Sequence, residues 1–207
     1  MKKNTLILIL VAFGMFSYVN TAKAQVVEEG NILINVFYGG PDLFGKVLES
    51  SNTNSSSTNT NVSVLGPLGA TVSYMISEKV GLGVDANYTD VSVTFSESAL
   101  DSAGNSVLYN YTFGRTVLRI MPRFDYHFTN NDNFDGYFGV AAGFRTATWY
   151  TESTDPYYVA DDTEGLNPIA IRLAVGGTYY LIDNLGLNLE IGLGGGGLVR
   201  GGLALKF

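Results

Sequence analysis

Hydrophobic and polar residues alternate with a period of two through most of this chain. Val80, Leu82 and Val84 alternate with small or polar residues, and the same pattern returns in residues 169–176 and 185–193. A period of two predicts β-strands with one apolar face, because helices repeat every 3.6 residues. Strands are expected over residues 31–40, 64–76, 80–95, 107–128, 135–150, 167–182, 185–194 and 198–207.

The connections between these strands alternate between long and short until the last link. The short links are residues 77–79, 129–134 and 183–184, the long links are 41–63, 96–106 and 151–166, and the last link is the tight hairpin 194–197. Each strand reaches the roughly 9–11 residues that a tilted strand needs to cross a bilayer. Bacterial barrels have an even strand number, short periplasmic turns and longer outside loops. The pattern therefore predicts an all-β fold, an eight-stranded antiparallel up-and-down transmembrane β-barrel with both termini in the periplasm.

The composition supports a membrane barrel and excludes several kinds of site. Charged residues make up 15% of the chain, well below the roughly 25% of soluble domains, and no internal apolar run has the length of a membrane helix. The chain has no cysteine and a single histidine, His127. Disulfides, thiolate metal sites, a lipoprotein anchor and multi-histidine metal sites are thereby excluded.

The two faces of the strands differ in a way that separates a membrane barrel from a soluble one. One face holds almost no charge, whereas the other carries glycines and charges of both signs near the strand middles. A face in contact with water would be rich in Lys and Glu along its whole length, so we expect the mixed charges to line a narrow lumen. An eight-stranded barrel is just wide enough for side chains to fill it, and buried charges need partners. The predicted lumen charge network comprises Asp85, Arg119, Arg123, Asp125, Arg145, Arg172, Glu190 and Arg200.

The first 24 residues have the pattern of a secretory signal peptide. A basic start at Lys2 and Lys3 precedes an apolar stretch of residues 6–16, and Ala22-Lys23-Ala24 forms a small-x-small cleavage site. The predicted domains are therefore a signal peptide at 1–24 and an outer-membrane β-barrel domain at 25–207. Cleavage removes three lysines and no acid, so the formal net charge falls from −7 to 9 − 19 = −10. Such an acidic chain is not expected to bind nucleic acid.

The last strand carries a familiar terminal pattern. Leu203 and Leu205 alternate up to a C-terminal Phe207, which resembles the assembly signal of bacterial outer-membrane proteins. The mature chain resembles the small eight-stranded outer-membrane barrels of the OmpX and OmpA-domain type. The resemblance implies a location in the cell outer membrane and contact with outer-membrane lipid and lipopolysaccharide. It also implies a monomer that is handled by periplasmic chaperones and the barrel-assembly machinery, and it implies no cofactor.

Aromatic residues near the strand ends are candidates for the two interfacial girdles of a membrane barrel. Phe124, Tyr126 and Phe128 lie at one end, and Tyr109, Tyr111, Phe113, Trp149 and Tyr150 lie at the other. Tyr109, Tyr111 and Phe113 share the parity of Arg119. They can face lipid only if a β-bulge intervenes, and otherwise that end stands clear of the membrane.

Three functions remain open from the sequence. The favoured one is a non-enzymatic barrel with a structural, surface-binding or adhesion role, and the main alternative is a narrow porin-like channel. A lipid A-modifying enzyme is a weaker alternative, because His127 falls at the periplasmic end of its strand, away from the outer leaflet. The long loops are acidic, and Asp155, Asp161, Asp162 and Glu164 are candidates for a divalent-cation site, although their spacing matches no calcium-loop template. The match of residues 192–197 to the dinucleotide fingerprint has no helix after it and is interpreted as a glycine hairpin.

Overall fold

A computed structural model describes residues 25–40, 60–101, 104–165 and 167–207. The predicted signal peptide and most of the first long loop lie outside the described residues. Within the described part of the chain, no helix is long and apolar enough to cross a membrane.

Nine strands form one antiparallel sheet in the described residues, and eight of them close into a ring. β1 pairs with β9, and β4 pairs with β5, which leaves no free edge around the ring; the ninth strand, β6, pairs only with β5. The predicted eight-stranded up-and-down barrel is therefore confirmed. The strands are β1 (Ile32–Gly40), β2 (Asn61–Ser77), β3 (Val80–Leu100), β4 (Ser106–Asn130), β5 (Phe134–Ser153), β6 (Asp162–Glu164), β7 (Ile169–Ile182), β8 (Leu185–Gly194) and β9 (Val199–Lys206).

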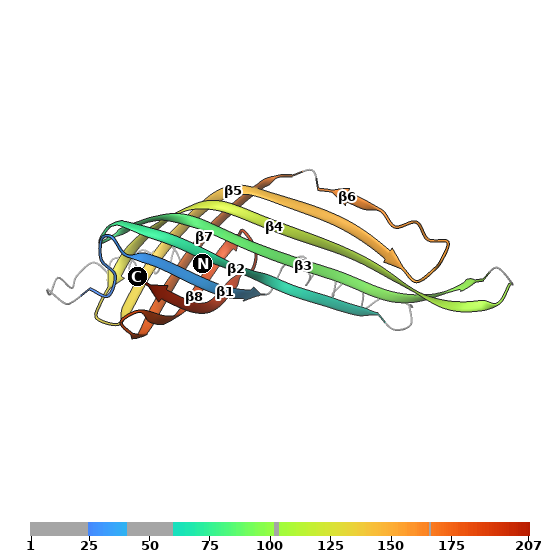
Figure 1. The fold of residues 1–207 in the computed structure, drawn as a ribbon, viewed down its shortest axis with the longest axis horizontal. Helices are drawn as coiled ribbons and strands as arrows, with labels where there is room; N and C mark the ends of the chain where they lie inside the picture. Colours follow the sequence, from blue (N-terminus) through green and yellow to red (C-terminus); the bar gives the residue numbers. More distant parts are fainter. Residues whose placement is uncertain (1–24, 41–59, 102–103, 166) are drawn as a thin grey trace, which may run out of the picture.

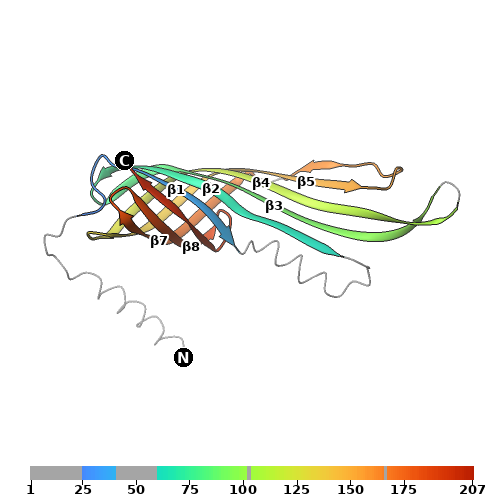
Figure 2. The ribbon, with the colours of Figure 1, turned by 60° about the horizontal axis from the view of Figure 1, so that its bottom comes forward.

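The ring is strongly asymmetric, because four strands are much longer than the rest. β2 to β5 have 17 to 25 residues, whereas β1 has nine and β9 has eight. The long strands continue as a curved sheet far beyond the ends of β1, β7 and β8 (Figures 1 and 2). We call this sheet, residues 61–65, 90–100, 106–117 and 146–153 together with β6, the extension. The segment 96–106, predicted as a loop, instead continues the β3–β4 hairpin, whose pairing extends to Leu100 and Ser106.

The side of β4 that faces away from the lumen changes character halfway along the strand. From Phe128 to Leu118 its residues are large and apolar and are exposed at the barrel surface. From Thr116 to Asn110 they are Thr, Gly, Thr and Asn. The apolar stretch has the roughly 9–11 residues that a tilted strand needs to span the hydrocarbon. The lipid layer on this strand therefore ends between Leu118 and Thr116.

The neighbouring strands change at the same level. Tyr88 on β3 pairs with Leu118, and Asp90 pairs with Thr116, so the change from apolar to polar occurs in one row. On β5 the outward residues change between Phe144 and Thr146. Since a polar row cannot lie in hydrocarbon without cost, the extension stands in water above the membrane.

In the extension the apolar residues lie on the opposite face. The β3–β4 register runs without a shift from Val80 to Leu100, so Phe95, Tyr111 and Phe113 share the face of the lumen residues. Trp149 also lies on this face, because it pairs directly with Arg115. The prediction of an interfacial girdle from Tyr109, Tyr111, Phe113 and Trp149 is therefore wrong. No bulge turns these side chains toward lipid, and this end of the strands stands clear of the bilayer.

We expect the fluorescence of Trp149, the single tryptophan, to show that its side chain is in contact with water and not with lipid. Trp149 is 42% exposed on the lumen-side face of the extension, above the apolar row. In lipid vesicles its fluorescence should be quenched strongly by acrylamide and hardly at all by brominated lipid. The control is a variant that combines Trp149→Phe with Phe124→Trp, whose tryptophan faces lipid and should show the reverse pattern. Strong quenching of wild-type Trp149 by brominated lipid would contradict this membrane boundary.

Candidate functional site

The lumen of the barrel holds a compact set of buried charges. Because alternate residues of each strand point inward, the polar face predicted from the sequence lines the interior. Among the described residues the buried charged side chains are four arginines and four carboxylates, so their formal charge sums to zero with His127 neutral. They are Asp85, Arg119, Arg123, Asp125, Asp135, Arg172, Glu190 and Arg200.

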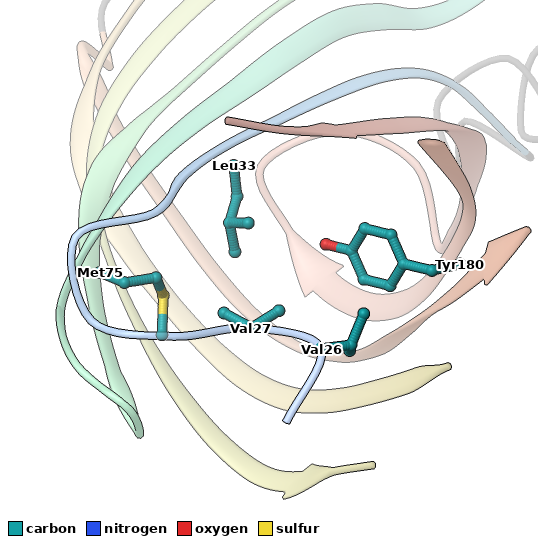
Figure 3. Close-up of a cluster of buried hydrophobic side chains, with 5 residues drawn as sticks. All are labelled: Val26, Val27, Leu33, Met75 and Tyr180. Atoms are coloured by element: carbon teal, nitrogen blue, oxygen red, sulfur yellow. The ribbon is translucent and has the colours of Figure 1, made fainter. Parts of the chain in front are cut away.

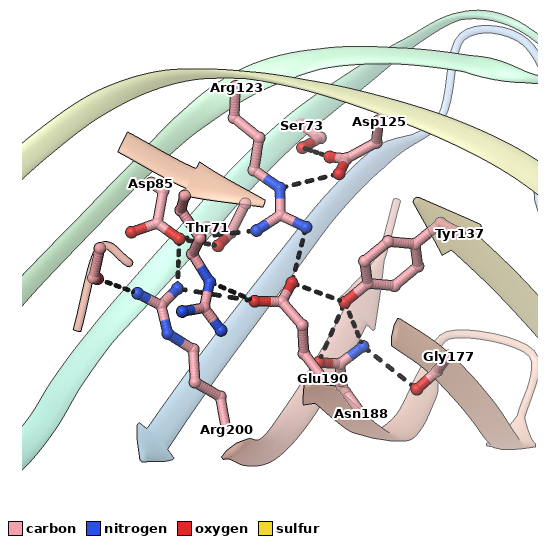
Figure 4. Close-up of polar contacts among 12 residues, drawn as sticks. Thr71, Ser73, Asp85, Arg123, Asp125, Tyr137, Gly177, Asn188, Glu190 and Arg200 are labelled. Carbon is pink, nitrogen blue, oxygen red and sulfur yellow. Dashed lines mark hydrogen bonds and ion pairs between the residues drawn. The ribbon is translucent and has the colours of Figure 1, made fainter. Parts of the chain in front are cut away.

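Glu190 on β8 is the centre of this network (Figure 4). Its Oε2 accepts a hydrogen bond from Arg123 Nη2 at 2.7 Å, and its Oε1 accepts one from Arg172 Nε at 2.7 Å. Tyr137 donates its hydroxyl proton to Glu190 Oε2 at 3.2 Å, and Arg200 Nη1 lies 3.8 Å from Oε1. One carboxylate thus joins side chains from β4, β5, β7 and β9 across the lumen.

Two aspartates complete the ion pairs on the β3–β4 side of the lumen. Asp85 Oδ2 lies 2.5 Å from Arg200 Nη1 and 3.6 Å from Arg123 Nη1. Asp125 Oδ1 accepts a hydrogen bond from Arg123 Nε at 2.8 Å, and its Oδ2 accepts one from Ser73 at 3.1 Å. Arg123 therefore contacts three carboxylates at once. Such multiple pairing satisfies charges that would be costly to bury alone.

Small residues make room for these large side chains. A Cβ atom added at Gly139 would lie 2.5 Å from Arg123 Nη2, and one added at Gly176 would lie 2.5 Å from the Tyr137 hydroxyl. Ala141 and Ala174 are also buried on the inner face. Packing therefore explains Gly139 and Gly176, since one lies opposite a guanidinium and the other opposite an aromatic ring.

The β8–β9 hairpin closes the lumen at the end that carries the extension. Its four glycines, Gly194–Gly197, all have positive φ angles of 57° to 88°, a conformation that side chains other than glycine adopt at a cost. This path turns their carbonyls inward. Arg172 Nη1 donates to the carbonyls of Gly194, Gly196 and Gly197 at 2.9–3.0 Å. Asn87 donates to that of Gly195 at 3.2 Å.

The N-terminal segment closes the other end. Val26 and Val27 are buried and pack with Leu33, Met75 and Tyr180 across the mouth of the barrel (Figure 3). The backbone of this segment bonds to both sides of the opening: Val27 N donates to Asn130 Oδ1 at 3.1 Å, and Lys206 Nζ donates to the Val26 carbonyl at 2.6 Å. This plug was not predicted from the sequence, where its signal is the apolar pair just after the predicted cleavage site.

His127 lies inside the lumen just above this plug. It is 3% exposed, and its Nδ1 lies 2.7 Å from Asp135 Oδ1. Its Nε2 has no hydrogen-bond partner, and a cavity of about 10 Å³ lies among His127, Asp135, Ser73 and Asp125. This space suits one water molecule, which could bond to Nε2. The chemistry available here is therefore that of an enclosed polar cluster out of reach of lipid.

Two predicted members of the lumen charge network lie apart from its centre. Arg119 is buried one level nearer the extension, where it donates to Asn87 Oδ1 at 3.1 Å and to Thr89 Oγ1 at 2.9 Å. Arg145, although it lies opposite Arg119 on β5, is only half-buried and donates to the Asn167 carbonyl at 2.9 Å. Its placement in the network is wrong, because β7 begins at Ile169 and the wall beside Arg145 ends there.

The sequence analysis missed several neutral or unassigned partners in the lumen. Tyr137, Asn188 and Asp135 are buried on inward positions of β5 and β8, and Asn188 Nδ2 donates to the Tyr137 hydroxyl oxygen at 3.0 Å. They lie at the same alternate, inward-facing positions of their strands as the predicted lumen charges, so the alternation of the sequence could have identified them. Neutral polar side chains at inward positions need hydrogen-bond partners just as charged ones do, because water is excluded from the lumen.

The acidic residues after β5 do not form a metal site. Asp155 accepts hydrogen bonds from Tyr111 and from the Tyr157 amide, and Asp162 and Glu164 pair with β5 through their backbones. Within the described residues, no group of three or more His, Cys, Asp or Glu side chains is arranged to hold a metal ion. The divalent-cation site that the sequence left open is therefore not assembled here.

The residues of the predicted assembly signal lie at alternate outward positions at the end of β9. Leu203 and Phe207 are exposed on the lipid side of the barrel, and Leu205 lies between them on the same face. The backbone of Phe207 exchanges hydrogen bonds with Ile32 at 2.8 and 2.9 Å, next to the closing β1–β9 pair. The terminal residues are thus part of the seam of the ring.

Comparison with known proteins finds one family and several solved barrels. A family model described as outer membrane protein β-barrel domain matches residues 24–194. No curated protein matches the chain.

Three solved structures are similar to this chain at low identity. The N-terminal β-barrel domain of Pseudomonas aeruginosa OprF is 12% identical, with 87% of this chain and 100% of that chain covered and a TM-score of 0.44. Pseudomonas aeruginosa OprG is 14% identical, with 87% and 97% covered and a TM-score of 0.42. Ail of Yersinia pestis, solved with the heparin analogue sucrose octasulfate, is 12% identical, with 86% and 99% covered and a TM-score of 0.39.

We expect Glu190→Gln to destabilise the barrel by about 3 kcal/mol, since removing one partner of a buried charge network leaves the others uncompensated. Urea unfolding in detergent micelles, followed by circular dichroism, measures the change. The matched control is Glu164→Gln on the exposed strand β6, which should change the unfolding free energy by less than about 0.5 kcal/mol. Equal effects of the two substitutions would contradict the central role of Glu190.

Proposed function

Because the chain belongs to the outer membrane protein β-barrel domain family, we propose that it is a non-enzymatic and non-conducting outer-membrane barrel that holds a β-sheet extension outside the cell. The observation that carries this proposal is the combination of a sealed, electroneutral lumen with an extension that stands clear of the lipid layer. The barrel acts as an anchor, and the extension is the part that meets partners. This is a surface-binding or adhesion role.

The contents of the lumen favour an anchor over a pore. An ion that crossed the barrel would have to pass the Val26–Val27 plug, the Glu190 network and the Gly194–Gly197 hairpin in turn. Each of these barriers is held by hydrogen bonds or ion pairs from several strands. Opening a path requires breaking buried charge pairs, which costs about 3–5 kcal/mol for each lost partner. The narrow channel remains the alternative, and conductance decides between the two.

The position of His127 disfavours lipid A chemistry. A hydrolase acting on a lipid must bring its base within hydrogen-bond reach of the nucleophile that attacks the substrate. The His127 ring is 97% buried inside the lumen, on the inner side of the N-terminal plug and at the opposite end from the extension. A lipid in either leaflet is separated from it by the barrel wall. We therefore propose that the protein has no enzymatic activity.

The orientation we propose puts the extension outside and both termini in the periplasm. The short β2–β3, β4–β5 and β7–β8 turns lie at the same end of the ring as Val26 and the C-terminus, and the extension lies at the other end (Figure 2). Chains that enter the membrane from the periplasm bring short turns to that side. In this orientation Leu203, Leu205 and Phe207 present the assembly signal toward the periplasm. The barrel-assembly machinery and periplasmic chaperones would meet them there.

We expect no steady conductance from the purified protein in planar bilayers. Wild-type protein should give a baseline current at 100 mV, because the lumen is filled by side chains. A general porin inserted into the same membrane serves as the positive control. Reproducible single-channel steps from wild-type protein would contradict the sealed lumen and establish the channel alternative.

Cysteine labelling of intact cells can test the orientation without a background, because the chain has no native cysteine. Tyr157→Cys lies beyond β5 at an exposed position near the tip, and Asp183→Cys lies in the exposed β7–β8 turn at the other end. A membrane-impermeant maleimide should label the first in intact cells and the second only after the outer membrane is opened. The reverse pattern would show that the extension faces the periplasm.

A further inference from the structure

The extension has two faces of opposite chemistry. Its lipid-side face carries a polar ladder in which Thr94 bonds to Thr112 at 2.9 Å, Ser96 to Asn110 at 2.8 Å and Ser98 to Ser106 at 2.7 Å. Its lumen-side face is apolar and aromatic, with Val62, Val64, Val91, Val93, Phe95, Tyr111, Phe113 and Trp149 in adjacent rows. The extension stands in water with hydroxyl groups on one face and aromatic rings on the other. An apolar face of this kind is typical of a surface that binds another molecule.

The aromatic rings form one continuous row. Phe95 stacks on both Tyr111 and Phe113 with ring centroids 5.8 Å apart, and Tyr158 meets the Tyr111 ring edge-on at 5.6 Å. Phe113 is 46% exposed and Phe95 and Tyr111 are half-buried, so the row is open to a partner mainly at Phe113. Alternate side chains of an extended polypeptide are roughly 7 Å apart. Tyr111 and Phe113 are alternate residues of β4, so they repeat along the strand at the same spacing as side chains that project from one side of an extended segment.

The extension as a whole is strongly negative, and part of this charge lies at the row. Residues 89–117 and 146–165 together contain eight acids and one base, Arg115, of which Asp90, Glu152, Asp162 and Glu164 are on the lipid-side face. Asp155 accepts the Tyr111 hydroxyl proton at 3.1 Å, and Glu97 follows Phe95 on the same face of β3. The pKa of the Tyr111 hydroxyl is raised, first by its partial loss of solvent and then by the hydrogen bond and negative charge of Asp155. An anionic partner would be repelled, and a cationic one attracted.

The face already holds one cation of the chain itself. The Arg115 guanidinium lies 5.0 Å above the Trp149 ring, on the same face as Phe113. Cation–π contact of this kind stabilises arginine and lysine on aromatic surfaces. The neighbouring Phe95–Tyr111–Phe113 row offers further rings. The carboxylates of Asp155 and Glu97 lie beside that row and can pair with a cation from a partner.

We propose that the lumen-side face of the extension binds an extended, positively charged polypeptide segment, with its arginine or lysine side chains on the Phe95–Tyr111–Phe113 row and paired with Asp155 and Glu97. This inference rests on the proposed function and names its partner class. Contact with rings and carboxylates together distinguishes this partner from a neutral glycan, which would use the rings alone. It also distinguishes it from a second acidic copy of this chain.

The test uses the full mature chain in nanodiscs of zwitterionic phosphatidylcholine, so that the peptide does not bind the lipid. The probes are an (Arg-Ser)₄ peptide and its neutral counterpart (Gln-Ser)₄. Trp149 is the only tryptophan and lies on the proposed surface, so its emission reports binding directly. We expect a saturable change with (Arg-Ser)₄ that weakens as salt is added and no saturable change with (Gln-Ser)₄.

The variants separate the face from general acidity. Phe95→Ser combined with Phe113→Ser should raise the dissociation constant roughly tenfold, since two cation–π contacts are lost. Thr94→Ala combined with Thr112→Ala changes the same two strands on the opposite face and should stay within about twofold. Asp155→Asn with Glu97→Gln should also weaken binding and reduce its salt dependence. Unchanged heat-modifiable gel migration checks that each barrel is folded.

Several results would overturn the proposal. Among them are equal binding by wild type and the Phe95/Phe113 variant, equal binding of the neutral peptide, and a saturable response to a neutral oligosaccharide but not to (Arg-Ser)₄. Self-association that depends on Phe95 and Phe113 would likewise assign the face to a second copy. Cysteine labelling that places Tyr157 outside while no peptide binds would reject this partner class and leave the proposed function standing. Labelling from the periplasmic side would reject the proposed function instead.

Discussion

The backbone hydrogen bonds of the ring are the constraint on which the rest of the structure depends. In hydrocarbon no water can satisfy an exposed amide or carbonyl, so a sheet that enters the membrane must have no free edge. The seam between β1 and β9, from Leu33–Lys206 to Gly40–Val199, removes that edge. Once the ring of eight strands is closed, alternate residues are forced inward into a lumen too narrow for bulk water. Every charge placed there must then find a protein partner.

The lumen network follows from that confinement. Four arginines and four carboxylates cancel one another, and the glycines opposite Arg123 and Tyr137 leave space for long side chains within a fixed diameter. Arg172 serves two purposes, because its Nε pairs with Glu190 while its Nη1 holds the glycine hairpin. The charge centre and the closure of the mouth are therefore coupled through one side chain. A network of this kind specifies which strands lie across from one another as well as filling space.

The sequence predicted the ring and its inward face well, and the physical reason is simple. Parity is a local property, so the inward direction of Arg172 and Glu190 can be determined from their own strands. The partners across the lumen depend on shear and register, which no local pattern contains. Arg145 shows the difference: it has the parity of a lumen residue, but the wall beside it ends where β7 begins. The plug of Val26 and Val27 was missed because two apolar residues carry no periodicity.

Only the outermost parts of the extension, residues 61–63, 96–106, 151–153 and β6, fall in the predicted loops, because Ser, Thr, Asn and acidic residues are frequent there and resemble a loop composition. The informative signal in the sequence is the move of the apolar residues from the lipid-side face of β3 and β4 to the lumen-side face. Phe95, Tyr111 and Phe113 keep the parity of Asp85 and Arg119, while the opposite face changes from Tyr88 to Asp90 within one pair of residues. A strand whose apolar side changes without a register shift has left one solvent environment and entered another. The position of that change marks the edge of the membrane, and it implies that the aromatic row beyond it cannot be stabilised by lipid. Those rings are retained in water above a barrel whose own lumen is already full, so their contacts must be made outside the membrane.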